Sequence, residues 1–211
     1  MKKILAIGLI VMMAAAVLPA VAQEEAAEPA VVGGGQPVKP GMKVALPCVV
    51  YSNCEDEGSP VFVASGWMGS VDDIEYDDCW QEKPRSGQSC IKVTFSNPRE
   101  WGGIAWQNPA NNWGDDEGGV DLTGAKKLTF WARGDKGGEM VEFKMGVIPR
   151  NKPFFDTGKA SLGRVQLDAA WQKFEMDLTD KDLSRIMTGF VFSVKGKSEP
   201  VIFYLDDIVF E

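Results

Sequence analysis

Two adjacent carboxylates interrupt the apolar C-terminal segment YLDDIVFE, residues 204–211. In a β-strand, neighbouring side chains point to opposite faces, so Asp206 shares a face with Tyr204 and Asp207 shares the other with Leu205. Both faces are apolar, so at least one carboxylate is expected where water is scarce. A buried carboxylate is costly unless it is hydrogen-bonded, paired or bound to a metal ion. The segment therefore needs a partner that stabilises a negative charge.

The chain of 211 residues contains no histidine. This excludes Ser-His-Asp and Cys-His catalysis, His-based zinc hydrolysis and most copper or iron sites. Glycosidases need two carboxylates at a set separation. Glu75 and Asp77 resemble the start of the E-x-D-x-x-E strand of laminarinase-like sandwich hydrolases, but Trp80 replaces the second glutamate. The sequence predicts a protein that is not an enzyme, and glycoside hydrolysis is the alternative.

Tryptophan is abundant, with seven in the chain. An indole face can cover the C–H patch of a sugar ring while neighbouring polar groups bond its hydroxyls. We expect a flat platform where the strand bearing Trp131 lies beside the strand bearing Glu142, and a rim in the loop-rich stretch WGGIAWQNPANNWG. The predicted ligand-binding residues are Trp106, Gln107, Asn112, Trp113, Trp131, Arg133 and Glu142.

Purely structural roles are the alternative for the same residues. Tryptophans often plug the ends of β-sandwiches, which is our interpretation of Trp101 and Trp171. Arg133 and Glu142 would then form an ordinary cross-strand pair on a solvated face.

Four cysteines lie in the N-terminal half of the chain, at Cys48, Cys54, Cys79 and Cys90. An even number in a secreted chain predicts two disulfides. Three pairings are possible, and Cys48–Cys54 with Cys79–Cys90 is favoured because both close short loops. A zinc ion held by four thiolates is the alternative, although no Cys-x-x-Cys pair is present.

The N-terminus predicts export. Residues 1–22 carry two lysines before an apolar run and have small residues at Ala20 and Ala22, which is typical of a signal peptide cleaved after Ala22. A membrane anchor is the alternative. Residues 23–40 are rich in Ala, Glu, Gly and Pro and predict a flexible linker. Cleavage changes the net charge from −8 to −10, which disfavours nucleic acid and anionic lipid as partners.

The remainder of the chain, residues 41–211, predicts one all-β domain. Hydrophobic alternation with period two predicts strands at 89–96, 127–133, 140–145, 164–167, 173–178, 190–194 and 201–210. One or two helical turns are expected at 180–186. Strands punctuated this often by turn residues indicate a β-sandwich or jelly roll of two antiparallel sheets.

The segments DLTGAKKLTFWARGDKGGEMVEFKMG, WQKFEMDLTDKDL, GFVFSV and IFYLDDIVFE carry a family likeness. They resemble the strand series of galactose-binding-like jelly rolls, in particular non-catalytic carbohydrate-binding modules and small secreted bacterial proteins of that fold. The likeness covers roughly residues 100–211, whereas the cysteine-bearing N-terminal third departs from it. Such a fold hosts several unrelated functions, so it does not define one glycan.

The resemblance also implies a structural calcium ion, because a carboxylate near the end of the last strand commonly binds one in that superfamily. Asp206 or Asp207 would be a ligand, with further oxygens from loops that include Asp72 and Asp73. The alternative is that one aspartate caps a turn or pairs with a cation. The cations considered for such a pair are Arg133, Arg164 and Lys173.

These inferences combine into one expected function. The chain is predicted to be a secreted or periplasmic, calcium-supported jelly roll that binds a polysaccharide without catalysis and is not inserted in a membrane. The alternative is a structural or assembly protein of the cell envelope or extracellular matrix, which would self-associate or bind an envelope protein through the same fold.

Overall fold

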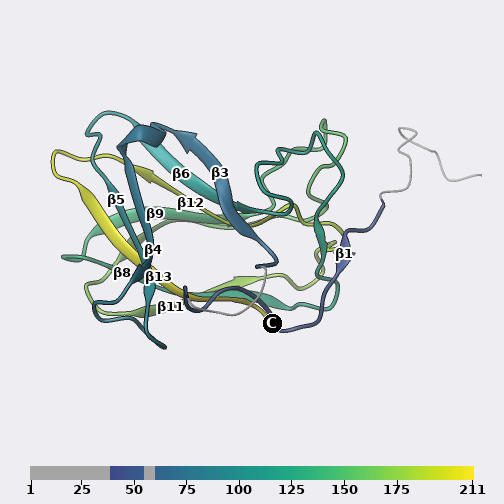
Figure 1. Ribbon diagram of the computed structural model, residues 1–211, viewed down its shortest axis with the longest axis horizontal. Coiled ribbons are helices and arrows are strands. Elements are labelled where there is room, and N and C mark those ends of the chain that lie inside the picture. Colours follow the sequence, from purple (N-terminus) through teal and green to yellow (C-terminus); the bar gives the residue numbers. More distant parts are fainter. Residues whose placement is uncertain (1–38, 55–59) are drawn as a thin grey trace, which may run out of the picture. The chain divides into compact units, whose positions relative to one another are not determined.

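The computed structural model describes residues 39–54 and 60–211 (Figure 1). The predicted signal peptide and nearly all of the predicted linker lie outside these residues. No helix in the described part of the chain is long and apolar enough to cross a membrane.

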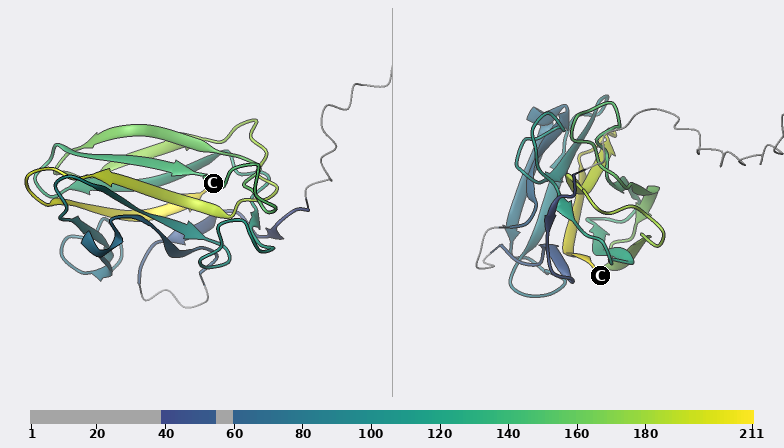
Figure 2. Two further views of the ribbon diagram at one scale, coloured as in Figure 1. Left: turned by 90° about the horizontal axis from the view of Figure 1, so that it is seen from above. Right: turned by 90° about the vertical axis from the view of Figure 1, so that its right-hand side faces the viewer.

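Two antiparallel sheets face each other as layers (Figure 1), and their strands run along the length of the sandwich (Figure 2, left). The five-stranded sheet has the order β10-β9-β12-β6-β3, and the six-stranded sheet has the order β11-β8-β13-β5-β4 with β2 also paired to β13. The predicted jelly-roll sandwich is confirmed. The strands of the five-stranded sheet are β3 (Val63–Gly69), β6 (Trp101–Gln107), β9 (Glu139–Met145), β10 (Ala160–Leu167) and β12 (Thr188–Lys195).

The six-stranded sheet contains the C-terminal strand at its centre. Its strands are β2 (Cys48–Tyr51), β4 (Ile74–Trp80), β5 (Cys90–Phe95), β8 (Lys127–Gly134), β11 (Gln172–Asp177) and β13 (Val201–Phe210). The short strands β1 (Met42–Lys43) and β7 (Val120–Asp121) pair in parallel and form a separate two-stranded sheet. A 3-10 turn, η1 (Val71–Asp73), precedes β4.

Alternation along each strand builds the core. Phe130 from β8 meets Phe143 from β9 and Phe190 from β12, with ring centroids 4.7 Å and 5.0 Å apart. All three rings are fully buried between the sheets. Because a buried Phe contributes roughly 1.5–3 kcal/mol relative to an exposed one, this contact fixes which face of each strand points inward.

Two local predictions are wrong. The segment 101–107 is a central strand and not a rim loop, because Gly102 and Gly103 allow close approach. A Cβ on Gly102 would lie 2.8 Å from the Phe95 side chain, and one on Gly103 would lie 2.4 Å from the Phe192 carbonyl oxygen. Residues 180–186 form no helix, because Ile186 is buried in a β-bridge with Val120.

Candidate functional site

The outward face of the five-stranded sheet carries a row of polar side chains that crosses three strands, β12, β9 and β10. Ser193 on β12 pairs with Gly103 on β6 and with Glu142 on β9, and Glu142 pairs with Arg164 on β10. Paired residues in neighbouring strands point to the same side of a sheet, so these side chains form one line. Gly103 has no side chain, so the polar groups lie on three strands, and two strand spacings make this line about 10 Å long.

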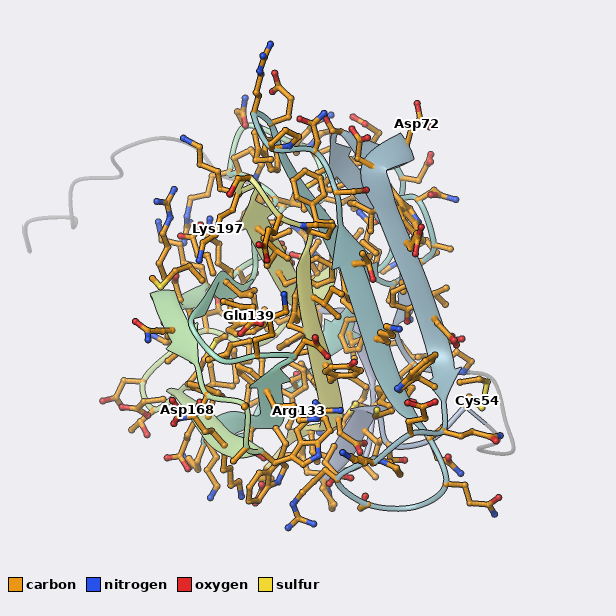
Figure 3. All side chains as sticks on the ribbon, turned by 90° about the vertical axis from the view of Figure 1, so that its left-hand side faces the viewer. Cys54, Asp72, Arg133, Glu139, Asp168 and Lys197 are labelled. Atoms are coloured by element: carbon orange, nitrogen blue, oxygen red, sulfur yellow. A yellow bond between two sulfur atoms is a disulfide. The ribbon has the colours of Figure 1, made fainter. Side chains whose placement is uncertain are left out.

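An exposed tryptophan stands beside this row. Trp101 pairs with Lys195, two residues along β6 and β12 from the Gly103–Ser193 pair and on the same face. The tryptophan is 47% exposed. Together these residues line a surface groove of about 610 Å³. Its remaining wall includes Met140, Lys144 and the turn that contains Lys197, which Figure 3 labels.

The central carboxylate of the groove is held ionised. Glu142 Oε2 lies 2.9 Å from Lys144 Nζ and accepts a hydrogen bond of 3.1 Å from Ser193 Oγ. The hydrogen bond with Lys144 is the largest cause that holds the pKa of Glu142 below its usual value, with Ser193 and Arg164 adding to it. An ionised carboxylate accepts hydrogen bonds from hydroxyls but is a poor general acid, so this geometry suits binding better than hydrolysis.

Trp106, a predicted ligand-binding residue, lies in the core. It is 2% exposed, and its ring centroid lies 5.4 Å from Phe190 and 6.0 Å from Tyr76. Because Trp101 and Trp106 are five positions apart in one strand, they point to opposite faces. The prediction that Trp106 contacts a ligand is therefore wrong.

Gln107 and Asn112 are also buried, and their polar groups are used within the fold. Gln107 Oε1 accepts a hydrogen bond from Ser65 Oγ at 3.1 Å, and its Nε2 donates to the Asn112 carbonyl at 3.0 Å. Asn112 Oδ1 accepts from the Gly114 amide at 2.9 Å. Their predicted ligand role is wrong, because both side chains shape the loop after β6.

Trp113 follows in that same loop and lies over the outward face of β3. A Cβ on Gly66 would lie 2.9 Å from Trp113 Cζ2, and Gly66 pairs with Ala105 on the outward side of β6. The half-buried Trp113 therefore shares a face with Trp101, several residues farther along the sheet.

The predicted platform of Trp131, Arg133 and Glu142 does not exist. β8 and β9 are consecutive in sequence but lie in different sheets, so Glu142 is on the other side of the sandwich from Arg133. The buried Arg133 guanidinium lies 3.7 Å from the ring centroid of Tyr204, and Arg85 lies 4.1 Å above the Trp131 ring. The chain itself therefore occupies one face of this tryptophan.

Loop 81–89 folds over the same part of the six-stranded sheet and supplies the partner of the buried carboxylate. Asp206 Oδ2 accepts hydrogen bonds from the amides of Arg85 at 2.8 Å and Ser86 at 3.2 Å, and Oδ1 accepts from the Asp207 amide at 2.8 Å. Burial raises the pKa of Asp206 to about 6, and the amides of Ser86 and Arg85 oppose that shift. Asp207 Oδ1 accepts from Ser86 Oγ at 2.7 Å.

The four predicted calcium ligands are not together. Asp72 and Asp73 precede β4, near the pairing of Phe95 with Val201, which is five residues or roughly 17 Å along β13 from Asp206. Figure 3 shows Asp72 at the opposite end of that view from Arg133, which pairs with Tyr204 beside Asp206. Asp206 faces amide donors where a cation would need oxygens, so this predicted ligand set does not fit calcium.

Chelation tests this disagreement. EDTA is expected to leave the melting temperature of the mature chain unchanged, because backbone amides already stabilise Asp206 and no group of three or more acidic, His or Cys side chains gathers among the described residues. Differential scanning fluorimetry with EDTA, and with calcium-saturated EDTA as control, measures it. A fall that only the calcium-free chelator causes would contradict this expectation.

The cysteine pairing also differs from the prediction. The disulfide joins Cys54 and Cys79, while Cys48 and Cys90 are buried free thiols. Burial raises the pKa of Cys48 to about 11 and that of Cys90 to about 12. The favoured pairs Cys48–Cys54 and Cys79–Cys90 are therefore wrong, and a site of four thiolates is excluded because Cys54 and Cys79 are oxidised together.

Of the residues that line the groove, sequence reasoning predicted only Glu142 as a ligand-binding residue. It interprets Trp101 as a plug of the sandwich and Arg164 as a candidate partner of an aspartate, and it assigns no role to Ser193. The available signal was the five-residue separation of Trp101 and Trp106, which places the two side chains on opposite faces once WGGIAWQ is treated as a strand.

Comparison with known proteins gives the fold only. No family model and no curated protein matches this sequence. Among solved structures, the family 30 carbohydrate-binding module of a cellulosomal cellulase of Clostridium thermocellum is 16% identical, covers 79% of this chain and 98% of its own, and has a TM-score of 0.53. Another family 30 carbohydrate-binding module is 15% identical, covers 79% and 99%, and has a TM-score of 0.52. The chain therefore has the β-sandwich fold of carbohydrate-binding modules.

Proposed function

We propose that this chain binds a polysaccharide along the outward face of the five-stranded sheet, without changing it chemically. One observation carries the proposal, namely the 47% exposed Trp101 next to the polar row of Ser193, Glu142 and Arg164. The indole supplies a flat apolar surface for a sugar ring, and the row supplies acceptors and donors for its hydroxyls.

The fold neighbours support the same class of ligand. The matched structures are described as carbohydrate-binding modules, and this chain covers nearly their whole length. At 15–16% identity the ligand of those proteins does not transfer residue by residue. Binding outside the cell depends on the predicted signal peptide, which lies outside the described residues. Self-association as an envelope or matrix protein stays a prediction.

Replacing Trp101 with alanine is expected to weaken polysaccharide binding by at least about tenfold, equal to about 1.4 kcal/mol. The loss follows from removing the exposed stacking surface while the inward face of β6 stays packed. Affinity gel electrophoresis against a panel of plant and bacterial cell-wall polysaccharides, followed by calorimetry on the retained ones, measures the effect.

Trp131→Ala is the matched control, because Trp131 lies on the opposite sheet and was a predicted ligand residue. It should leave affinity within about twofold if binding uses the groove. Thermal melts of both variants exclude unfolding as the cause. Binding lost in Trp131→Ala and kept in Trp101→Ala would assign the ligand to the other face, and no saturable binding to any polysaccharide would reject the function.

A further inference from the structure

The groove beside Trp101 has the opposite charge to the rest of the molecule. The chain has 22 Lys and Arg against 30 Asp and Glu, a net charge of −8. The groove contains five cationic side chains, those of Arg99, Lys144, Arg164, Lys195 and Lys197. Only two carboxylates line it, Glu100 and Glu142, so it has a local excess of three positive charges.

Most of this positive charge is not neutralised within the fold. Lys144 pairs with Glu142 at 2.9 Å, and Lys197 Nζ donates to the Gly138 carbonyl at 2.9 Å. Within the ranges 39–54 and 60–211, the side chains of Arg99, Arg164 and Lys195 form no hydrogen bond and no ion pair within 4.0 Å. All three are exposed.

These free cations surround the stacking surface. Lys195 is the cross-strand partner of Trp101, so the two Cβ atoms are about 5 Å apart on the same face. Arg99 lies two residues before Trp101, and Arg164 ends the polar row on β10. A sugar ring stacked on Trp101 therefore has a cation close to its edge, and the chain of sugars that continues along the row reaches another.

We infer that the groove binds an anionic polysaccharide whose sugar rings carry carboxylate groups, such as a uronic acid polymer. This inference rests on the proposed function and specifies its ligand. A neutral glycan would leave Arg99 and Lys195 without charged partners and Arg164 with only the attraction of its cross-strand neighbour Glu142, whereas carboxylates on successive rings pair with all three. Arg164 offers the planar fork that matches a carboxylate in bidentate geometry.

The acidic remainder of the chain does not prevent this binding. At physiological ionic strength the Debye length is about 8 Å, so charges on the far sheet are screened while those lining the groove act directly on a bound ring.

The test compares polysaccharides that share a backbone and differ in charge. Polygalacturonate and alginate are each paired with their fully esterified forms, and carboxymethyl cellulose is paired with hydroxyethyl cellulose, in calorimetry and affinity gels with the mature chain. At least one anionic member is expected to bind roughly tenfold more tightly than its neutral partner, and raising NaCl from about 50 to about 500 mM should remove most of that difference.

Charge variants locate the effect. The double variant Lys195→Gln, Arg164→Gln should lose about five- to tenfold in affinity for the anionic polymer and keep its affinity for any neutral one. Lys43→Gln, Lys173→Gln removes the same charge from exposed positions outside the groove and should bind like the wild type. A thermal melt of each variant verifies folding.

The outcomes separate the two proposals. Equal affinity for charged and neutral partners would overturn the anionic ligand and leave polysaccharide binding in place. Retention of none of these polymers or of the wider cell-wall panel would overturn both. Binding of duplex DNA as tight as that of the best polysaccharide, lost in the same double variant, would overturn the glycan and leave a general anion groove.

Discussion

Replacing Asp156 with alanine is expected to lower the free energy of unfolding by about 4 kcal/mol. This carboxylate is 6% exposed and accepts four hydrogen bonds. Its Oδ2 accepts from the Ile148 amide at 2.8 Å and the Thr188 hydroxyl at 2.6 Å, and its Oδ1 accepts from the amides of Met187 and Thr188 at 2.5 Å and 3.1 Å. Alanine leaves three buried amides and the Thr188 hydroxyl without this acceptor, so the loop before β10 loses part of its attachment to β12 and keeps the bonds of Gly146 and Val147 to Thr188.

Urea unfolding followed by tryptophan fluorescence measures this loss. Asp156→Asn is expected to recover only part of it, because the amide nitrogen is a donor facing donors. Asp177→Ala is the matched control, since the exposed Asp177 accepts hydrogen bonds only from Thr179, whose amide lies 2.8 Å away. Its cost should stay below about 1 kcal/mol. A similar loss in both variants would contradict the role assigned to the buried network.

The fold was predictable because alternation is a local signal. Segments such as 127–133 and 140–145 alternate apolar and polar residues whether their neighbours are known or not, and burial of Phe130 and Phe143 then sets their inward faces. The segment 101–107 was not predicted as a strand, because its two glycines and two tryptophans give no alternation of apolar and polar residues. Its inward side is decided by the packing of Gly102 against the Phe95 side chain, and Gly103 lies close to the Phe192 carbonyl of the neighbouring strand; both phenylalanines are distant in sequence.

The site was not predictable from strand order. Consecutive strands usually pair, which favours a shared face for Arg133 and Glu142. In this sandwich the connection after β8 crosses from one sheet to the other instead. The crossing turn is stabilised by Glu139, whose Oε1 accepts a 2.9 Å hydrogen bond from the Lys136 amide, and by Gly137 and Gly138 at positive φ. A short glycine-containing loop with flanking charges is equally typical of a β-hairpin within one sheet. The sequence alone therefore does not distinguish a hairpin from a connection that crosses between the sheets.

The buried acid of the last strand shows the same limit. Its need for a partner followed from apolar neighbours on both faces, whereas the identity of the partner depended on loop 81–89, more than a hundred residues earlier in the chain. Every residue except proline has a backbone amide, so the sequence does not show which amides will bind the carboxylate. The resemblance to galactose-binding-like jelly rolls implies a metal ion at this aspartate, whereas in the structure the amides of a turn hydrogen-bond it, which was the alternative drawn from the residues.

Asp206→Ala is expected to destabilise the chain by about 3 kcal/mol near pH 5, because the amides of Arg85, Ser86 and Asp207 lose their acceptor in a fully buried site. Asp206→Asn should cost less, since the carbonyl oxygen can still accept from loop 81–89. The two variants also differ from the wild type in how stability depends on pH, because neither can ionise at this position.

The sign of that dependence follows from the raised pKa of Asp206, about 6 in the folded chain against an ordinary value of 3.8. Between about pH 4 and pH 6 the unfolded chain releases the proton first, so this group lowers wild-type stability as pH rises, by about 2 kcal/mol, with little further change above pH 7. Asp206→Asn removes this component, so its stability relative to the wild type should improve over the same interval. Asp207→Asn removes a neighbouring charge that helps to raise the pKa of Asp206, and asparagine accepts the positive φ of 48° there, so stability should still fall over this interval, but by less than in the wild type. Urea unfolding at pH 4, 5, 6 and 7 measures all three proteins, and parallel curves for the wild type and Asp206→Asn would show that the burial of Asp206 does not disfavour its charged form.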